Sequence, residues 1–377
     1  MTKIFSFLNS ATLLFLLSCA PPQTEQKSQS STIQFLRTLN LPVTKIHLAL
    51  SDYQQGILAN LNLENLSIER LRPIVADVKL KIIGHELMAL SREGEDSIGI
   101  LEPNSGKVLT QKKLPENFNA FDVIRDDLGR IWITGTNSNL LYCFDKNLNQ
   151  IENTIDLSDL RDSDDQWAEP AQILLATPKR LLVSAQRLRR NFNNTGFWVP
   201  EEESALAIID TENMTLNSWQ KIPVSNPVAL MMTSESKIEL VGSGDLSKQS
   251  NLDSSQISLK WNGEKIITDK LLRYKEAKIL AAGLLKINDP MTHESKDTKM
   301  VKLVWWPNYK KSCVEVNQKE IFCQSNDQNG YIFSQIQTSG QAIFLSFVNE
   351  AALLIINSEN GEWKKINLPM PAISMAI

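Results

Sequence analysis

The chain has 377 residues, 42% of them hydrophobic, so it is long enough to bury a large core. Its formal net charge of −4, without a long run of Lys or Arg, argues against a protein that binds nucleic-acid backbones. Its 15 glycines and 15 prolines are too few for a low-complexity or collagen-like chain.

The N-terminus has the pattern of an export signal. Lys3 supplies a positive charge, residues 4–17 are mostly apolar, and the sequence Leu-Leu-Ser-Cys ends at Cys19. The apolar stretch is shorter than the about 20 residues that a membrane-spanning helix needs. The four residues ending at Cys19 resemble the lipobox of bacterial lipoproteins. The resemblance implies cleavage before Cys19, diacylglycerol on its sulfur and usually an N-acyl chain such as palmitate. An ordinary signal peptide with a chance cysteine, or a short membrane anchor, is the alternative.

These features divide the chain into three parts. We expect a signal peptide over 1–18, a lipidated cysteine with a flexible tether over 19–40, and one folded domain over 41–377. The start of the tether is polar and rich in Pro, Ser and Gln, as flexible linkers are. The residue after the cysteine is Ala20, whereas an Asp at that position would resemble an inner-membrane retention signal. We therefore expect a lipid-anchored protein of the bacterial envelope, in the outer membrane.

Residues 120–157 show the repeating unit of the domain most clearly. Four apolar or β-branched segments are separated by short turns rich in Asp, Asn and Gly: 120–125, 130–135, 140–144 and 150–157. Such tight connections predict an antiparallel four-stranded meander, because parallel strands need long crossovers. One such sheet cannot bury both of its faces alone, so the pattern predicts neighbouring units.

An apolar run that ends in Asp, Asn or Glu before a polar turn recurs along the chain. The key positions are Asn60, Glu102, Asp145, Asp210, Asn262 and Asn357. The first two steps match the repeat of about 40–50 residues found in propellers. One longer step contains an insertion of about 20 residues, and the last spans two periods, with the missing copy near 302–323. The sequence thus predicts seven units.

The two ends of the domain complement each other. The first unit, from near Thr44, lacks an inner strand, whereas residues 371–377 form one strand too many. Pairing them closes the ring and removes unpaired strand edges. We predict an all-β protein, a β-propeller of seven four-stranded blades closed by the C-terminal strand. A pair of sandwiches would accommodate the strands but not their near-constant period.

A known family shares part of this pattern. Residues 204–211 (SALAIIDT), 219–224 (WQKIPV), 226–228 (NPV) and 242–245 (GSGD) resemble the strand and turn register of YncE-like and related exported seven-bladed propellers. Some members of that group are lipoproteins. The resemblance covers about 120–270, and its motifs are turn signatures, so it implies a fold and says almost nothing about activity.

Residue types that carry catalysis or bind metals are sparse. His47, His85 and His293 fall in different units without metal-ligand spacing, which disfavours histidine-based chemistry. No nucleophile elbow, P-loop or dinucleotide fingerprint occurs. An acidic cluster between the third and fourth units could hold Ca²⁺ but lacks the EF-hand pattern, and a solvated loop is the alternative. Its members are Asp159, Asp162, Asp164, Asp165 and Glu169. No other cofactor is indicated.

The insertion at 187–203 is the sharpest functional candidate. It lengthens the turn between the second and third strands of the fourth unit, and long loops in tight repeats often serve function. It combines arginines with aromatics, the residues enriched at binding hot spots: Arg187, Arg189, Arg190, Phe192, Phe197 and Trp198. The alternative is that the aromatics only pin the loop to the propeller. A second irregular segment, 286–302, is also predicted to be a long loop.

Three further cysteines remain after Cys19. Cys313 and Cys323 flank a predicted hairpin, and an exported compartment permits a disulfide if the strand register places them opposite each other. Cys143 lies in an apolar strand and is expected to be a buried thiol.

Two functional hypotheses follow. The first is a membrane-anchored binding or scaffold propeller for a protein, peptide or glycan, without nucleic acid. The second is a propeller enzyme, similar to lactonases and lyases, with a divalent cation in the central channel. Converging carboxylates in that channel would favour the enzyme, and an apolar or plugged channel would oppose it. A role similar to the propeller of the outer-membrane β-barrel assembly machinery is a variant of the first hypothesis. The sequence leaves the oligomeric state open.

Overall fold

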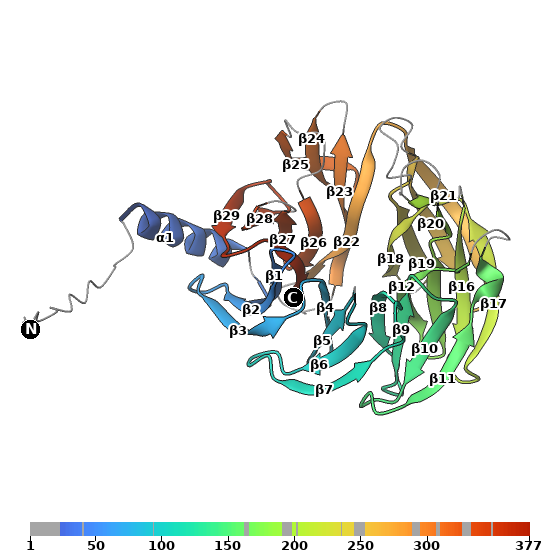
Figure 1. The fold of residues 1–377 in the computed structure, drawn as a ribbon. Coiled ribbons are helices and arrows are strands. Elements are labelled where there is room, and N and C mark those ends of the chain that lie inside the picture. The colour runs from blue at the N-terminus through green and yellow to red at the C-terminus, as the bar shows by residue number, and fades with distance from the viewer. Residues whose placement is uncertain are drawn as a thin grey trace, which may run out of the picture.

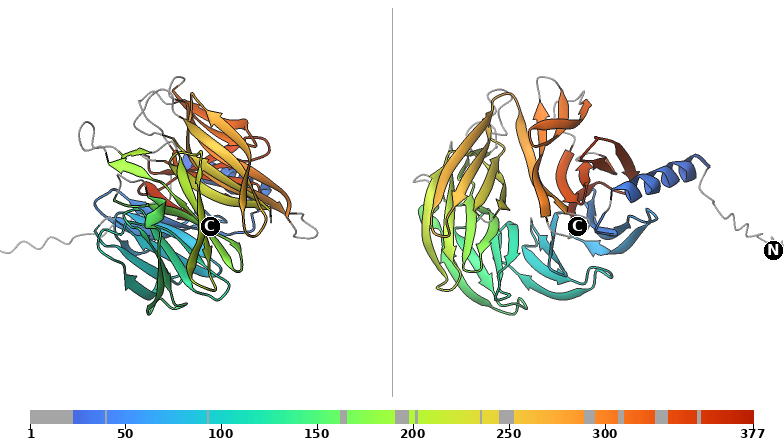
Figure 2. Two further views of the ribbon diagram at one scale, coloured as in Figure 1. Left: turned by 90° about the vertical axis from the view of Figure 1, so that its right-hand side faces the viewer. Right: turned by 180° about the vertical axis from the view of Figure 1, so that it is seen from behind.

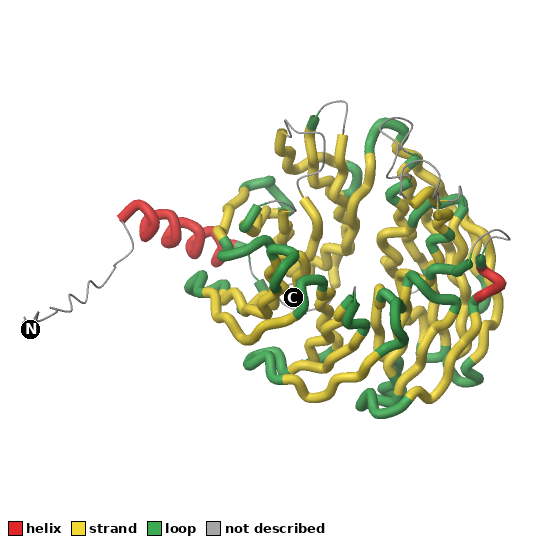
Figure 3. Tube along the Cα trace, viewed as in Figure 1, coloured by secondary structure: helices red, strands yellow, loops and turns green. Residues whose placement is uncertain are grey.

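The chain folds into a ring of seven antiparallel four-stranded sheets, as the computed structural model shows (Figure 1). The structure describes residues 23–377 except 40, 93, 162–165, 191–197, 201–202, 235, 245–252, 289–294, 307–309, 326–332 and 348–349. Strands are the predominant element of the described chain, and the one long helix projects from the side of the ring (Figures 2 and 3). The predicted seven-bladed propeller is confirmed.

We number the blades so that blade 1 contains the ring closure. Blade 1 comprises β1 (Lys45–Ser51), β2 (Gly56–Asn62), β3 (Ile68–Ile74) and β30 (Ala372–Ala376). Blade 2 comprises β4 (Val78–Ile83), β5 (Glu86–Ser91), β6 (Ser97–Leu101) and β7 (Val108–Lys113). Blade 3 comprises β8 (Ala120–Arg125), β9 (Ile131–Gly135), β10 (Leu140–Phe144) and β11 (Ile151–Asp156).

The short 3₁₀ helix η1 (Ser158–Leu160) leads to blade 4, which comprises β12 (Pro170–Thr177), β13 (Arg180–Ala185), β16 (Ser204–Asp210) and β17 (Thr215–Ile222). Blade 5 comprises β18 (Pro227–Ser234), β19 (Lys237–Gly242), β20 (Ser254–Trp261) and β21 (Ile266–Tyr274). Blade 6 comprises β22 (Lys278–Asn288), β23 (Ser295–Trp306), β24 (Lys311–Val316) and β25 (Lys319–Ser325). Blade 7 comprises β26 (Phe333–Ser339), β27 (Ala342–Phe347), β28 (Ala352–Asn357) and β29 (Trp363–Asn367).

The C-terminal strand closes the ring. β30 pairs antiparallel with β1, with His47 opposite Ala376 and Leu48 opposite Met375. β1 also pairs with β2, so it has hydrogen-bonded neighbours on both sides. The predicted closure by residues 371–377 is therefore confirmed, and blade 1 is built from both ends of the domain.

The core lies between adjacent blades. The two middle strands of a blade are buried on both faces, as in β9 and β10, whereas an outer strand such as β7 alternates between half-buried and exposed residues. Trp132 of β9 is fully buried, and its Nε1 donates a hydrogen bond to Asp126 Oδ2 at 2.9 Å. Each apolar cluster thus joins two blades, which is the mutual burial that a single sheet cannot provide.

Side chains also join neighbouring blades by hydrogen bonds near the axis. Asp122 Oδ2 accepts from the backbone N–H of Ile173, and Gln172 Nε2 donates to the carbonyl of Val228 at 3.0 Å. Comparable bonds run from Thr338 Oγ1 to the carbonyl of Leu284 and from the N–H of Leu80 to Ser374 Oγ. The inner strands leave backbone groups at the channel, and side chains of an adjacent blade satisfy them.

The expectation of a flexible tether over 19–40 is wrong for most of its described part. Helix α1 (Gln23–Thr38) occupies it, and the C-terminal part of the helix packs on blades 1 and 7. The buried residues are Thr32, Phe35 and Leu36 of the helix and Leu39, which directly follows it. Their spacing is that of one helix face, a signal that the polar composition of the segment concealed.

The long loop expected over 286–302 is also wrong. β22 and β23 extend on both sides of residues 289–294 and pair from Lys278–Trp305 out to Asn288–Ser295. Polar and charged residues continue these strands beyond the body of the blade, so composition suggested a loop. Within the described part of the chain, none of the helices combines the length and the apolar character needed to cross a bilayer.

Candidate functional site in the central channel

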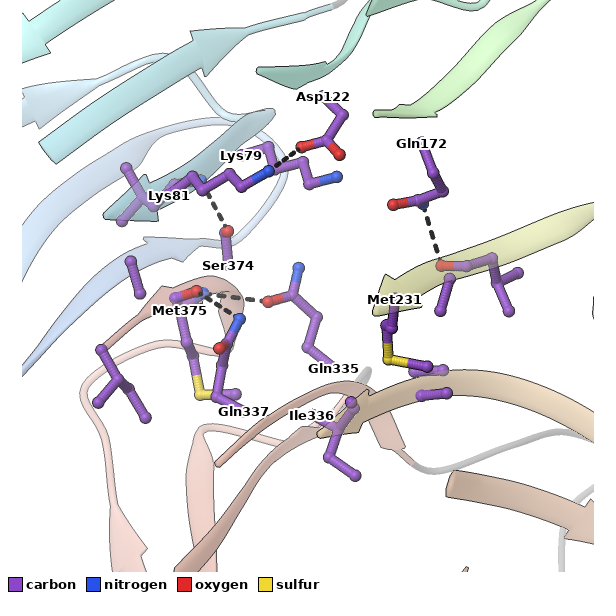
Figure 4. Close-up of a pocket in the computed structure, with 18 of the residues that line it drawn as sticks. Lys79, Lys81, Asp122, Gln172, Met231, Gln335, Ile336, Gln337, Ser374 and Met375 are labelled. Carbon is purple, nitrogen blue, oxygen red and sulfur yellow. Dashed lines mark hydrogen bonds and ion pairs between the residues drawn. The ribbon is translucent and has the colours of Figure 1, made fainter. Parts of the chain in front are cut away.

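A channel runs between the inner strands of the seven blades. Its cavity volume is about 790 Å³, and β4, β8, β12, β18, β22, β26 and β30 all contribute to its wall. A cavity of this size is in the range of small-molecule and peptide sites. The wall is uneven, because the charged side chains Lys79, Lys81 and Asp122 lie together and Met231 lies across from them, although Gln172 lies near Met231 and Met375 lies near the lysines (Figure 4).

Blade 2 supplies the cations of the polar side. Lys79 and Lys81 are two residues apart on β4, so both point toward the channel, while Val78 and Leu80 are buried between blades. Lys79 Nζ donates to the carbonyl of Phe121 at 2.8 Å and lies 4.7 Å from the centre of the Phe121 ring. Lys81 Nζ is 2.8 Å from Asp122 Oδ1.

Asp122 is the acidic partner of these lysines. It is 4% exposed, and besides Lys81 its carboxylate accepts hydrogen bonds from the backbone N–H groups of Val123 and Ile173 at 2.9 and 3.2 Å. Burial by itself raises the pKa of Asp122, but Lys81, Lys79 and the hydrogen bonds outweigh it, so the pKa lies below its usual value. The carboxylate is therefore ionised at neutral pH.

Lys79 has a perturbed pKa. Burial lowers the pKa of Lys79 to about 8, Asp122 opposes this effect, and Lys81 and Arg92 add to it. The amine is thus mostly protonated at pH 7 and loses its charge within about one to two pH units above that. Lys79 therefore changes its charge close to neutral pH.

Amide and hydroxyl side chains continue the polar side across the ring closure. Gln335 Nε2 donates to the carbonyl of Ile373 at 2.6 Å, and its Oε1 accepts from the N–H of Met375 at 3.0 Å. Gln337 Nε2 donates to the carbonyl of Met375 at 3.3 Å. These amides hold β30 against β26, so their first role is to fix the closing strand.

The apolar side is contributed by blades 4, 5 and 6. Its side chains come from β12, β18 and β22 and include Leu174, Leu230, Met231, Met232, Leu280 and Leu284. Methionine is unbranched and polarisable, so it adapts to ligands of different shape. In Figure 4, Met231 lies across the channel from Lys79, Lys81 and Asp122.

The arrangement suits an anionic group attached to an apolar body. A carboxylate can approach the Lys79 ammonium, while the rest of the ligand covers the methionines and leucines. A divalent cation fits poorly, because among the described lining residues Asp122 is the one carboxylate and its oxygens already hold Lys81 and two N–H groups.

The insertion of blade 4 lies where the sequence placed it, between the second and third strands. It contains a two-stranded hairpin, β14 (Leu188–Arg190) and β15 (Trp198–Pro200), in which Arg190 pairs with Trp198. The side chains of Arg189, Arg190 and Trp198, and all of Phe192 and Phe197, lie outside the described residues.

Arg187 has a structural environment that the sequence did not indicate. It is 4% exposed, and its Nη1 donates to the carbonyl of Glu203 at 2.9 Å, across the base of the insertion. Glu169, also buried, accepts a hydrogen bond from the N–H of Leu188. Both residues fix the base of the hairpin. Among the other acidic residues of the predicted cluster, Asp159 lies in η1, and Asp162, Asp164 and Asp165 are outside the described residues.

The described cysteines occupy strands. Cys313 and Cys323 lie directly opposite each other in β24 and β25, and their Sγ atoms are joined at 2.15 Å. Cys143 is buried, and burial raises the pKa of its thiol to about 12. Cys19 lies outside the described residues. Of the histidines, His47 is buried and its Nδ1 is 2.7 Å from Asn60 Oδ1.

Sequence reasoning missed the channel residues. The segment 77–83 (DVKLKII) carries two lysines at alternate positions of an apolar inner strand, and this was the available signal. These lysines lie in neither an insertion nor a motif, because the channel is formed by ordinary blades.

Comparison with solved structures supports the class of the fold. The structure is similar to a protein from Lactobacillus plantarum, with a TM-score of 0.59 and 11% identity over 88% of this chain and 98% of that one. It is also similar to the periplasmic gluconolactonase of Pseudomonas aeruginosa, with a TM-score of 0.56 and 10% identity over 87% and 97% of the two chains. Apo AztD from Citrobacter koseri gives a TM-score of 0.51 and 8% identity over 89% and 98%. No family model and no curated protein matches the chain. At these identities the similarity defines the fold, a seven-bladed β-propeller, and no activity.

Proposed function

We propose that this protein is a lipid-anchored binding propeller of the bacterial envelope, whose central channel takes an acidic, partly apolar ligand. A peptide with a free carboxylate is the partner class that we favour. The observation that carries the proposal is the division of the channel wall into a cationic side around Lys79 and an apolar side around Met231. A neutral glycan would interact poorly with the cationic side, since it carries no negative charge, and would cover little of the apolar side.

The enzyme hypothesis has less support. One solved structure of similar fold is a gluconolactonase, so the fold is compatible with lactone chemistry. The divalent cation that we expected of such an enzyme needs several oxygen ligands. The described channel offers Asp122, which is held by Lys81 and by backbone N–H groups. The residues that line this channel suit the binding of a ligand better than metal-assisted hydrolysis.

A pair of matched peptides tests the binding proposal. The probes are an apolar hexapeptide with a free C-terminal carboxylate and the same peptide with a C-terminal amide, measured by calorimetry. We expect the acid to bind at least about tenfold more tightly, since one charge-assisted hydrogen bond is worth about 1.5–3 kcal/mol. Lys79→Met should remove this preference, whereas Lys113→Met, at an exposed position of β7, should retain it. Equal binding of both peptides, or of neither, would contradict the proposal.

The pH dependence provides a second test of the same site. Because the pKa of Lys79 is about 8, the amine loses its charge between about pH 7 and 9. The preference for the acid should therefore decline over this range, and Lys79→Arg should preserve it to higher pH. A preference that stays constant up to pH 9 would assign the recognition to another cation.

The anchor and the insertion are tested separately. Cys19→Ser should move the protein from the membrane fraction to the soluble fraction, and continued retention would discard the lipid anchor. Shortening 187–203 to a tight turn should leave the propeller folded and remove capture of a protein partner in a pull-down. Recovery of the same partners would reject the insertion as the contact surface.

A further inference from the structure

The interface between blades 5 and 6 differs from the others in its packing. Its apolar cluster contains four buried residues, Ala229, Val241, Ile279 and Met300, whereas the cluster between blades 4 and 5 contains twelve. Polar and charged side chains from β19, β20 and β23 occupy the rest of this interface. A propeller that needed only stability would fill the interface with apolar side chains.

A cleft of about 230 Å³ opens in this interface. We call it the polar cleft and define it by six residues that line it: Lys237, Glu239, Gln256, Ser258, Lys270 and Lys302. Its volume is roughly seven to eight times the about 30 Å³ that a water molecule occupies in the liquid. It is therefore large enough for a molecule of about seven non-hydrogen atoms.

The floor of the polar cleft is a buried hydrogen-bond network in which one acceptor atom, Gln256 Oε1, has no partner among the described residues. Glu239 Oε1 accepts from Ser258 Oγ at 2.7 Å, and Glu239 Oε2 accepts from Gln256 Nε2 at 3.1 Å. Gln256 is only 8% exposed, and within the described residues its Oε1 has no hydrogen-bond partner. A buried acceptor without a partner is costly, so a donor from a bound molecule is expected there.

A buried ammonium stands on the side of the cleft that blade 6 provides. Lys302 is 1% exposed, and its Nζ is 3.2 Å from Glu315 and donates to the hydroxyl of Tyr274. An ammonium has three donors, and these two contacts use two of them. Lys302 is thus held in place by Tyr274 and Glu315, and it also lines the cleft.

The mouth of the cleft is cationic. Lys237 and Lys270 are exposed there, and Lys237 Nζ is 3.1 Å from Glu239. The lining contains three lysines and one glutamate, and Glu315 pairs with Lys302 from outside the lining, so one positive charge is left for an anion to compensate. The open acceptor on the floor adds a second requirement, a donor on the same molecule.

We propose that the polar cleft binds a small carboxylate that also carries a hydroxyl or ammonium donor, such as a hydroxy acid or a free amino acid. The carboxylate faces Lys270 and Lys302, and the donor reaches Gln256 Oε1 on the floor. This site is separate from the central channel, and its test does not depend on the channel ligand.

Four probes of similar size separate the requirements. Glycerate and serine carry both a carboxylate and a donor, propionate lacks the donor, and glycerol lacks the carboxylate. In titrations followed by calorimetry, we expect glycerate or serine to bind at least about tenfold more tightly than propionate and glycerol. The ranking of glycerate against serine tells a hydroxy acid from an amino acid.

Variants with a matched control complete the test. Lys270→Met, at an exposed position, should lower the affinity for the probe at least about tenfold. Lys265→Met, in the exposed turn of the same blade, should leave the affinity unchanged. Gln256→Glu should also abolish binding, because it places a carboxylate opposite the ligand. The proposal is overturned if none of the probes binds at millimolar concentration, which would leave water as the occupant, or if Lys270→Met binds as the parent does.

Discussion

Asp122 provides the sharpest test of how the blades are held around the channel. It belongs to blade 3, its Oδ1 accepts from Lys81 of blade 2, and its Oδ2 accepts from the N–H of Ile173 of blade 4. Asp122→Ala leaves the N–H groups of Val123 and Ile173 buried without their carboxylate acceptor. Each orphaned donor costs about 1–3 kcal/mol. The Lys81 pair adds little, because its side chain is 34% exposed.

We expect Asp122→Ala to lower the free energy of unfolding by about 3–5 kcal/mol, and Asp122→Asn by about 1–3 kcal/mol, since the amide keeps one acceptor. Urea denaturation followed by fluorescence measures both, with Asp127→Asn as the control because Asp127 is exposed on the same blade. The reasoning fails if Asp122→Ala unfolds within about 0.5 kcal/mol of the parent.

The same residue has a defined pH signature. Its pKa is lower in the folded protein than the about 3.9 of an unfolded aspartate. The contribution of the Asp122 carboxylate to the free energy of unfolding is therefore complete above about pH 5. This contribution is lost as the pH falls through the pKa of Asp122 in the folded protein. The difference between the parent and Asp122→Asn should be constant from about pH 5 to 7 and shrink below about pH 4.

Three further predictions concern the packing of the fold. Gly135→Ala should destabilise by about 1–3 kcal/mol in urea, because a Cβ there would lie 2.5 Å from a backbone oxygen, whereas Gly99→Ala, with no atom closer than 3.7 Å, should be nearly neutral. Burial lowers the pKa of His47 below about 6.5, so acid should destabilise the parent as the pH falls below that value, and His47→Gln should lack this slope in melting curves. Alkylation in denaturant should label Cys313 and Cys323 only after reduction, and labelling without reductant would contradict the bridge. Replacing both cysteines by Ser should lower the free energy of unfolding in urea by about 2–3 kcal/mol, as expected for a bridge across ten residues.

The repeat could be read from the sequence because each blade encodes its own turns. Asp145 directly follows the third strand of its blade and Asp210 ends that of the next blade. Their side chains accept hydrogen bonds from the backbone N–H groups of the following turns. Asn226 has a positive φ of 50° immediately before an inner strand, and its side chain bonds Ser243. These interactions are local or span one blade, so a single repeat contains all the information they need.

The channel and the polar cleft could not be read in this way. Lys81 meets Asp122 41 positions later, and the N–H of Leu80 meets Ser374 294 positions later. Their contacts depend on the rotation of each blade against the next, which the sequence of one blade does not specify. Lys302 and Glu239 likewise face one cleft from different blades. In α1, by contrast, the helical spacing around Phe35 was present in the sequence, and composition masked it.

The closing sheet also determines the order in which the molecule can be finished. A chain made from its N-terminus completes β1 more than 300 residues before β30, its hydrogen-bonding neighbour. At about 5–20 residues per second, β1 waits roughly a quarter of a minute to a minute with one edge open. A strand edge of that kind is where mispairing between molecules begins. Blade 1 therefore holds the first strands to emerge and is the last blade to be completed.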